Sequence, residues 1–350
     1  MKSKVIVVSV RKPSNFGGAE IVWHNLKRGR FKFENICLDD KRIPLIIKMI
    51  PEMFHLKEII ASKRLLKNAA SKNQKIIIYD KIFGWRKIKT KSKLICYNHG
   101  SYTMAGLRFK KKNLFVYLFY KYVFGFIEKR SYANADKIIA VSESVKDEII
   151  DYFKVPKEKI VVINNGVDLK KFKHLNNKNK LRKKYHLSLN KRIILFPGRP
   201  SFGKGFDIAE KVLKNLGQTY FMLVLSDGSS KLKNIKFMGK ISNEKVPEIY
   251  NCANLCLFPS RYEGNSVSVL ESAACGTPLI LSKTGLIKTE KSVEEFTCDS
   301  TKEYITKIKK LFDNDNLKKA SRKWIAFSKK FAIEKQILEL KKLIQKEVLK

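Results

Sequence analysis

Short runs of β-branched and aliphatic residues alternate along this chain with longer stretches of helical periodicity, and no other feature limits the possible folds as strongly. Strand–helix alternation of this kind is typical of parallel sheets in a doubly wound α/β architecture. A polar stretch rich in lysine and asparagine, 170–190, interrupts the alternation, which then begins again. The sequence therefore predicts two Rossmann-like units.

The expected strands form two sets, one on each side of the polar stretch. We expect an N-terminal domain over residues 1–172 and a second domain over residues 173–315. Apolar residues at helical spacing, such as Ile333, Ile337 and Leu340, predict one terminal amphipathic helix over 316–350. The expected strands are Val5–Val10, Glu34–Leu38, Lys75–Tyr79, Lys93–Tyr97, Lys137–Val141 and Ile160–Ile163, then Arg192–Pro197, Tyr220–Leu225, Ile235–Met238, Leu255–Pro259 and Pro278–Leu281.

The chain is strongly basic, with a formal net charge of +41 over 350 residues. Residues 41–130 alone hold 22 Lys and Arg against 4 Asp and Glu. A field of this sign attracts nucleic acid, anionic lipid headgroups or phosphorylated substrates. Within it, Lys41–Ala70 and Phe109–Arg130 mix basic and apolar residues at roughly helical spacing. Such helices either lie on an anionic membrane or pack against the first sheet with their lysines outward.

Several features of the sequence predict where the protein acts. The first residues lack a signal-peptide pattern. The longest aromatic and apolar stretch, Leu114–Ile127, is interrupted by Lys121, and its 14 residues fall short of the roughly 20 that span a bilayer. Six scattered cysteines in apolar contexts predict reduced core thiols rather than disulfides or a zinc site. We therefore expect a cytoplasmic protein, peripheral on the inner face of the cell membrane if its basic helices bind lipid.

The loops after the predicted strands are the candidate binding site, because ligands of open α/β sheets bind beyond the carboxyl ends of the strands. Gly17 and Gly18 follow the first strand and open a helix, where the backbone can approach an anion closely. His99 follows the strand at Lys93–Tyr97, beside a glycine. The structural alternatives are a tight turn for the glycines and an ordinary structural role for the histidine.

The second set of strands supplies two cations in the same kind of position. Arg199 and Lys204 lie in a glycine-punctuated loop after the strand Arg192–Pro197. Fixed cations stabilise the negative charge that grows on a departing diphosphate, without a metal. The alternative reading is a pair of solvated cations, which contributes little.

Pro259–Glu271 is the most informative segment of the chain. It reads as the end of a strand, a loop and a helix that starts near Asn265, whose side chain could cap it. Glu263 precedes the helix and Glu271 lies about two turns into it, and carboxylates of this kind accept hydrogen bonds from sugar hydroxyls well. The backbone N–H groups expected to form an anion site at the helix start are those of Gly264, Asn265, Ser266 and Val267.

With these residues, the chain resembles the retaining family-4 glycosyltransferases of the GT-B fold. Seven matches occur in order over most of the chain, and two glutamates separated by seven residues are the signature of that family. The matches are Gly17-Gly18-Ala19-Glu20, His99-Gly100, Ala135-Asp136 with Val141-Ser142-Glu143, Asn165-Gly166-Val167-Asp168 with Phe172, Gly198-Arg199 with Lys204-Gly205, Asp227-Gly228, and Pro259-Ser260 through Glu271 with Gly276-Thr277-Pro278.

The resemblance implies two facing Rossmann-like domains with the active site in the cleft between them. Arg199 and Lys204 would hold the diphosphate of a nucleotide-sugar donor. Glu271 would bind the ribose hydroxyls, and Glu263 would contact the transferred sugar near the reacting carbon. The family requires neither a bound divalent metal nor a cofactor beyond the nucleotide-sugar substrate.

The first domain would complete the site and bind the acceptor. Gly17 and Gly18 would close over the diphosphate, and His99 would lie by the sugar and the approaching acceptor. The family commonly sends its last helix back to the first domain, which suits Asn316–Lys350.

This chain departs from the family pattern near the nucleotide and the sugar. Asn265-Ser266 replace Phe-Gly, Ser268 stands where proline is frequent, Ser226 replaces a glycine, and a Gly-Gly turn is reduced to Thr284-Gly285. None of these changes removes a charged role, so they affect the identity of the donor rather than the reaction.

We therefore expect a retaining glycosyltransferase that acts on a glycan or lipid-linked acceptor, in the synthesis of glycans, glycolipids or cell-surface polysaccharides. One alternative is a basic peripheral membrane or nucleic-acid-binding protein on a GT-B scaffold without transferase activity. It would leave the ordered glutamates, arginine and glycines unexplained, and the sequence carries no recognisable RNA-binding signature. A phosphorylase-like or epimerase-like relative is a further alternative, without sequence support for a pyridoxal lysine or a free-phosphate pocket.

Overall fold

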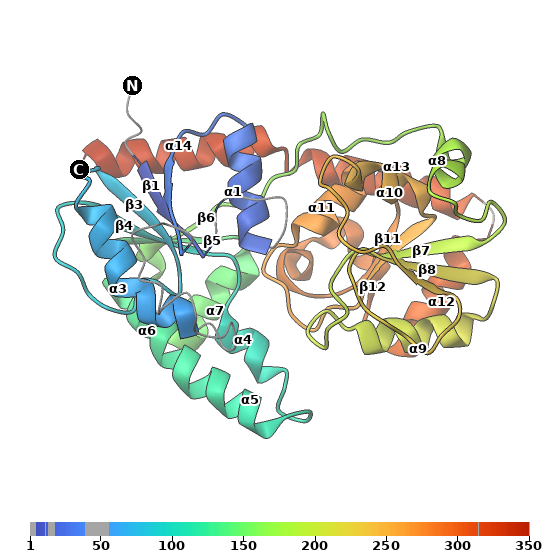
Figure 1. Ribbon diagram of the computed structural model, residues 1–350, viewed down its shortest axis with the longest axis horizontal. Coiled ribbons are helices and arrows are strands. Elements are labelled where there is room, and N and C mark those ends of the chain that lie inside the picture. Colours follow the sequence, from blue (N-terminus) through green and yellow to red (C-terminus); the bar gives the residue numbers. More distant parts are fainter. Residues whose placement is uncertain (1–4, 11, 13–17, 39–55, 314, 350) are drawn as a thin grey trace. The chain divides into compact units, whose positions relative to one another are not determined.

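The computed structural model describes residues 5–10, 12, 18–38, 56–313 and 315–349 (Figure 1). The chain divides into two compact units: unit 1 comprises Met1–Asn165 with Ile333–Lys350, and unit 2 comprises Gly166–Ala332. These limits differ from the expected domain limits of 172/173 and 315/316. The difference has a local cause, because the Val167 N–H donates to the Phe331 carbonyl at 2.8 Å and joins the two ends of unit 2.

Unit 1 is built on a parallel sheet of six strands in the order β2-β1-β3-β4-β5-β6. The central strands are short aliphatic runs that are buried along their length, as expected for strands covered on both faces. The strands are β1 (Val5–Val8), β2 (Glu34–Ile36), β3 (Ile76–Asp80), β4 (Lys93–Asn98), β5 (Lys137–Ala140) and β6 (Ile160–Val162).

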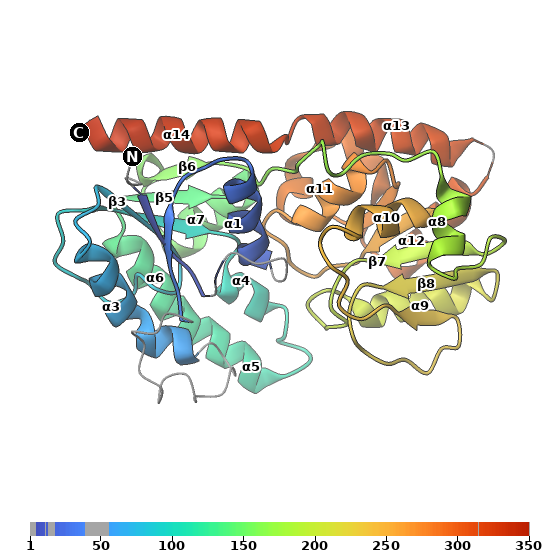
Figure 2. The ribbon, with the colours of Figure 1, turned by 45° about the horizontal axis from the view of Figure 1, so that its top comes forward.

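The helices of unit 1 include one that returns from the far end of the chain. This helix, α14 (Ile333–Leu349), packs against α1 (Gly18–Arg28), and a Cβ at the neighbouring Gly29 would overlap Ile337 (Figure 2). Gln336 also donates to the Tyr97 hydroxyl at 3.0 Å. The other helical segments are α3 (Leu56–Ala70), α4 (Tyr102–Leu107), α5 (Leu114–Phe119), the π-helical turn η2 (Tyr120–Phe124), α6 (Gly125–Asn134), α7 (Glu143–Phe153) and the 3-10 turn η3 (Lys157–Lys159).

Unit 2 is also built on a parallel sheet of six strands, in the order β12-β11-β10-β7-β8-β9. The strands are β7 (Arg192–Phe196), β8 (Tyr220–Val224), β9 (Ile235–Phe237), β10 (Leu255–Phe258), β11 (Leu279–Ser282) and β12 (Thr297–Cys298). The chain winds outward from the pair β7 and β10 in both directions, which is the doubly wound topology.

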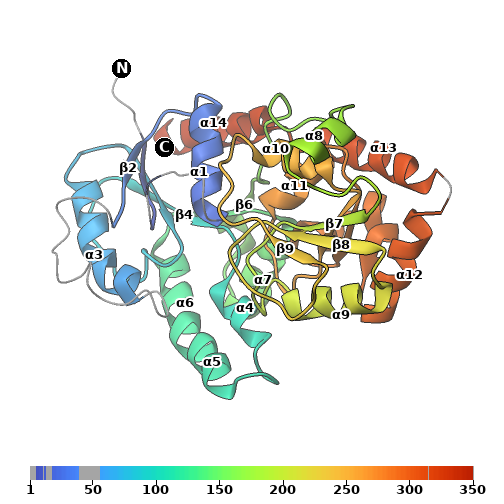
Figure 3. The same cartoon turned by 45° about the vertical axis from the view of Figure 1, so that its right-hand side comes forward.

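Helices cover both faces of the second sheet. Helices α9 (Phe206–Leu216) and α12 (Thr301–Leu311) pack together on one face, and α11 (Val267–Ala274) and α13 (Asn316–Lys329) pack together on the other (Figure 3). The remaining helical segments are α8 (Lys178–Lys184), α10 (Val246–Cys252) and the 3-10 turns η4 (Gly285–Thr289) and η5 (Lys291–Phe296).

The structure confirms the predicted fold class and all eleven predicted strands, each within two residues of its expected limits. It adds β12, whose two residues are too few to produce a periodic pattern. The prediction of one terminal helix over 316–350 is wrong. The chain breaks the helix at 330–332, where the Phe331 carbonyl bonds outside the helix, so α13 lies in unit 2 and α14 in unit 1.

Two predictions from composition can be compared directly with the described residues. All six cysteines are buried free thiols, as predicted, and burial raises the pKa of Cys256 to about 12. Among the residues described, every helix is too short or too polar to cross a bilayer.

Candidate active site

The topology of unit 2 brings two loops together. Because β7 and β10 are adjacent and the strand order reverses between them, the loops that follow them open at the same edge of the sheet. The loop after β7 holds Arg199 and Lys204, and the loop after β10 holds Glu263. This is the switch point at which doubly wound sheets bind their ligands.

Lys204 and Glu263 form an ion pair across these two loops. The Lys204 Nζ donates to the Glu263 Oε1 at 2.6 Å. The lysine side chain is 40% exposed and the glutamate side chain 17% exposed, so solvent reaches the pair mainly from the lysine side. A cation and a carboxylate of this kind can accept a phosphate and a sugar hydroxyl side by side.

Arg261, in the loop after β10, forms hydrogen bonds with residues that follow β7. Its guanidinium donates to both carboxylate oxygens of Asp207, at 2.7 and 2.8 Å, and to the Phe202 carbonyl at 2.6 Å. It also lies 3.7 Å from the centre of the Phe202 ring, and the Arg261 N–H donates to the Gly203 carbonyl at 2.9 Å. The sequence reasoning missed this residue, although it stands two positions before Glu263 in the signature segment.

The backbones of the same two loops lie in direct contact at Gly205 and Pro259. Gly205 precedes α9 with φ of +70°, a left-handed conformation that favours glycine. A Cβ at this position would overlap the carbonyl oxygen of Pro259 in the loop after β10. Only glycine therefore allows the lysine loop to lie directly against the glutamate loop.

Replacing Arg261 by alanine is expected to loosen this junction. The variant loses charged hydrogen bonds worth about 2 kcal/mol in total, since exposed ion pairs add little beyond the bond to the carbonyl. We expect the free energy of unfolding in urea to fall by about that amount and the donor KM to rise about fivefold. Asp207→Asn is the matched control, because it keeps the bond from Arg261 to Phe202. Equal donor KM values for Arg261→Ala and the wild type would contradict this role.

The start of α11 differs in detail from the prediction. The helix begins at Val267 with Ser266 at the N-cap position, so the prediction that Asn265 caps it is wrong. Ser266 makes no capping hydrogen bond with its side chain. Gly264 and Asn265 are buried, and the Gly264 carbonyl accepts from the Leu286 N–H at 2.9 Å.

A small cavity lies beside this helix start. Its volume is about 20 Å³, which is room for one water molecule and not for a sugar. Its polar lining comes from Glu263, Asn265 and Ser266 before α11, and from Ser282 at the end of β11 with Thr284 just after it. Apolar side chains, among them Phe258 and Leu281, complete the lining, so the cavity places polar and apolar groups next to Glu263.

Glu271 is a buried carboxyl group within α11. The Tyr250 hydroxyl lies 3.2 Å from its Oε2 and 3.3 Å from the Ser268 carbonyl. Burial raises the pKa of Glu271 to about 7, against the opposing effects of the Tyr250 hydrogen bond and the charge of Lys171. The group is thus poised to change charge near neutral pH.

Arg199 shares the loop of Lys204 but makes none of the side-chain contacts described above for this cluster. Its side chain is exposed, and no hydrogen bond or ion pair among the described residues involves the guanidinium. The structure therefore brings Lys204, Glu263 and the start of α11 together, and leaves Arg199 on the surface of the same loop.

In unit 1, the predicted His99 is held by an aromatic and acidic environment. Its ring stacks on Tyr97 at 4.4 Å between centroids and forms a T-shaped pair with Trp23 at 5.7 Å. Its Nε2 lies 3.1 Å from the Asp80 Oδ1. Asp80 ends β3 and was missed, although the rule that ligands bind beyond the carboxyl ends of strands applies to it as it does to His99.

The other ring nitrogen of His99 and the other carboxylate oxygen of Asp80 are buried without a hydrogen-bond partner among the described residues. Lys81 is buried next to them and lies 4.0 Å from the centre of the Tyr102 ring. Burial lowers the pKa of Lys81, while the nearby charges of Glu128 and Asp80 raise it. Unpaired buried polar atoms of this kind are rare and often belong to functional sites.

Of the two glycines predicted to approach the diphosphate, Gly17 lies outside the described residues. Gly18 is the first residue of α1 and is exposed, and a Cβ there would meet nothing within 4 Å. No three His, Cys, Asp or Glu side chains in the described part of the chain are placed to share a metal ion.

Comparisons with known proteins agree with this architecture. Residues 33–171 match the model of Glycosyltransferase Family 4, and residues 177–331 match that of Glycosyl transferases group 1. The structure of Anabaena HepE in complex with UDP-glucose superposes with a TM-score of 0.74 at 16% identity, covering 98% of this chain and 99% of that one. The chain therefore has the GT-B fold.

Curated proteins similar to this chain include two bacterial enzymes that are named for glycan or glycolipid synthesis. The capsular polysaccharide biosynthesis glycosyltransferase CapM of Staphylococcus aureus is 30% identical over 62% of each chain. The alpha-galactosylglucosyldiacylglycerol synthase of Streptococcus pneumoniae is 28% identical over 48% of each chain. The matches span about half the length of these curated relatives. Two family models in the expected order, on two sheets of the expected topology, show that the chain belongs to glycosyltransferase family 4.

Proposed function

We propose that the protein transfers a sugar from a nucleoside diphosphate sugar to an acceptor hydroxyl, with retention at the anomeric carbon. The observation that supports this most directly is the Lys204–Glu263 pair at the switch point of unit 2. It offers a cation for a diphosphate and a carboxylate for sugar hydroxyls within one hydrogen bond of each other.

In this proposal, unit 2 binds the donor. Lys204 and Arg199 bind the diphosphate, and the N–H groups at Gly264–Val267 favour negative charge at the start of α11. Glu263 accepts hydrogen bonds from the hydroxyls of the transferred sugar, and Glu271 accepts them from the ribose. Donor binding exchanges the Lys204–Glu263 ion pair for contacts with phosphate and sugar.

The chemistry proposed is a front-face displacement. The bond between the anomeric carbon and the phosphate oxygen breaks, and the acceptor oxygen bonds to the same face of that carbon. The acceptor proton passes to the departing phosphate oxygen. Lys204 and Arg199 stabilise the charge that grows on the leaving group, so their effect is larger in the transition state than in the bound donor.

For the acceptor, we propose a glycan or a lipid-linked sugar bound by unit 1 at the inner face of the cell membrane, with His99 at the reacting hydroxyl and Gly17 and Gly18 at the diphosphate. Support comes from the relatives, since the CapM protein acts in capsular polysaccharide biosynthesis and the pneumococcal synthase is named for a diacylglycerol glycolipid. The complex of HepE with UDP-glucose supports a nucleotide-sugar donor.

A panel of nucleoside diphosphates tests the proposal by thermal shift. We expect one base to raise the midpoint of unfolding by about 5 °C at a concentration of about 100 times its Kd, which corresponds to about 2.7 kcal/mol. The matching nucleoside monophosphate should stabilise the protein less, since it lacks the second phosphate. If RNA or heparin stabilises the protein while every nucleotide fails to do so, the non-enzymatic alternative is favoured instead.

A further inference from the structure

The helical stretch formed by α5, η2 and α6 presents apolar side chains to solvent. Of the twelve exposed large apolar residues among those described, half lie in the part of this stretch between positions 114 and 126. Phe115 is 66% exposed, Tyr122 is 61% exposed and Phe126 is 54% exposed. We call this group the aromatic face; its members are Leu114, Phe115, Leu118, Tyr122, Val123 and Phe126.

The aromatic face lies on a rigid support rather than on a loose helix. On the inner side of the same stretch, Phe124 is fully buried and stacks on Tyr120 at 4.9 Å. A Cβ at Gly106 in α4 would overlap Tyr120, so α4 and η2 are packed as closely as they can be. The outward side chains are therefore exposed because the inner side of the helix is already filled.

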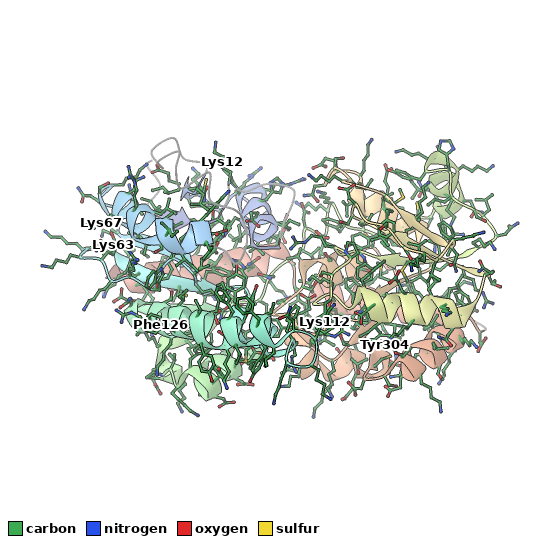
Figure 4. The ribbon with its side chains drawn as sticks, turned by 60° about the horizontal axis from the view of Figure 1, so that its bottom comes forward. Lys12, Lys63, Lys67, Lys112, Phe126 and Tyr304 are labelled. Atoms are coloured by element: carbon green, nitrogen blue, oxygen red, sulfur yellow. The ribbon has the colours of Figure 1, made fainter. Side chains whose placement is uncertain are left out.

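Basic residues surround the aromatic face. Figure 4 shows Lys112 and Phe126 near the two ends of the aromatic face. Lys121, in the middle, lies 5.7 and 5.1 Å from the ring centres of Tyr117 and Tyr122. The single acidic residue between positions 108 and 130, Glu128, is buried. The basic residues of this span are Arg108, Lys110, Lys111, Lys112, Lys121, Lys129 and Arg130.

We propose that the aromatic face and its basic rim seat unit 1 on an anionic lipid bilayer. Aromatic and aliphatic side chains enter the boundary between headgroups and acyl chains, while lysine and arginine contact the phosphates. A second copy of the chain is a poor occupant, because a twofold interface would place the two basic rims against each other. The bilayer is favoured because it alone offers an apolar interior beneath a continuous negative surface.

The position of the aromatic face relates it to the acceptor side of the enzyme. Glu128, in α6, accepts hydrogen bonds from the Ser101 hydroxyl at 2.7 Å and from the N–H groups of Tyr102 and Thr103 at 2.8 and 3.1 Å. These three residues directly follow His99-Gly100. The helix that lies on the bilayer thus holds the loop of the candidate acceptor residue. This inference deepens the proposed function, on which its acceptor part rests.

Vesicle cosedimentation of the full chain tests the proposal. Wild-type protein should sediment with vesicles containing about one third phosphatidylglycerol and stay in solution with pure phosphatidylcholine. Raising NaCl from about 0.1 M to about 0.5 M should release most of it. Two variants, Phe115→Ser with Phe126→Ser and Lys110→Gln with Lys111→Gln and Lys112→Gln, should each weaken partitioning about tenfold or more.

Matched controls separate this surface from charge in general. Lys231→Gln with Lys233→Gln and Lys236→Gln removes the same charge from unit 2, and Leu338→Ser removes an exposed apolar side chain from α14. Both should bind vesicles as the wild type does. Absence of wild-type binding, or equal losses in the controls, overturns the proposal, and self-association through the aromatic face without vesicle binding overturns it in favour of a protein interface.

Two further measurements complete the test: tryptophan fluorescence with vesicles and the thermal shift with nucleotide. Phe115→Trp should show a blue shift of emission on adding the anionic vesicles, and no shift would mean that the side chain stays in water. The nucleotide-dependent thermal shift should be the same in all these variants. Loss of vesicle binding with an unchanged nucleotide shift would concern the membrane proposal alone, and loss of the nucleotide shift with unchanged vesicle binding would concern the proposed function alone.

Discussion

Replacing Lys204 by alanine is expected to lower turnover about a hundredfold while the donor still binds. The cation stabilises charge that is fully developed only as the phosphate departs, so its removal costs about 2.7 kcal/mol in the transition state and less in the ground state. Glu263→Gln should lower turnover about tenfold or more, because the amide keeps the shape but loses a charged acceptor for the sugar hydroxyls. Initial rates at saturating donor, with the acceptor held fixed, measure both effects.

The control for Lys204→Ala is Lys214→Ala, which removes an exposed lysine from α9 in the same unit. Both variants should keep the wild-type circular dichroism spectrum, since the Lys204–Glu263 pair is partly exposed and contributes little to folding. Turnover within a factor of about two of the wild type in both Lys204→Ala and Glu263→Gln would remove these residues from the proposed site.

Replacing Glu271 by glutamine is expected to stabilise the fold and to weaken the binding of the donor. Burial raises the pKa of Glu271 from 4.5 to about 7. Between these values the folded protein holds a proton that the unfolded chain releases, so the wild-type free energy of unfolding falls as pH rises. The loss is complete above about pH 7 and amounts to about 3 kcal/mol, which the neutral glutamine avoids.

Urea unfolding at several pH values measures this effect. The Gln variant should exceed the wild type by up to about 3 kcal/mol at pH 8 and by little at pH 5, while its donor affinity at pH 8 falls about tenfold. Glu295→Gln, on an exposed carboxylate paired with Lys323, should leave the pH profile unchanged. Parallel profiles for Glu271→Gln and the wild type would show that the carboxyl group titrates normally, and unchanged donor affinity would remove it from the ribose site.

Local periodicity explains why the strands were predictable. The run Ile76–Asp80 is buried along its whole length. A short aliphatic run of this kind predicts a central parallel strand without any knowledge of the rest of the fold. Periodicity does not detect a break of three residues between two amphipathic helices, such as the one between α13 and α14. The break between α13 and α14 is set by a hydrogen bond from Val167 to Phe331, and those partners are far apart in sequence.

The candidate site, too, has a part that local sequence predicts and a part that depends on the folded structure. Sequence position after a strand was enough to select Lys204, Glu263 and His99, because topology brings such loops to one edge of their sheet. It did not reveal that Lys204 pairs with Glu263 or that Asp80 meets His99, since these contacts depend on rotamers and loop geometry. Arg261 was overlooked for a related reason: its partners Phe202 and Asp207 lie more than fifty positions earlier.

The division of unit 1 between two parts of the chain also sets an order of synthesis. A ribosome completes every residue of unit 2 before it adds Ile333–Leu349, the helix that covers α1 and bonds to Tyr97. Domains generally fold as units when their residues have emerged. The first sheet to be translated is thus the last to acquire all of its partners, and until then the strand that leads to His99 lacks the Gln336 contact at its tyrosine.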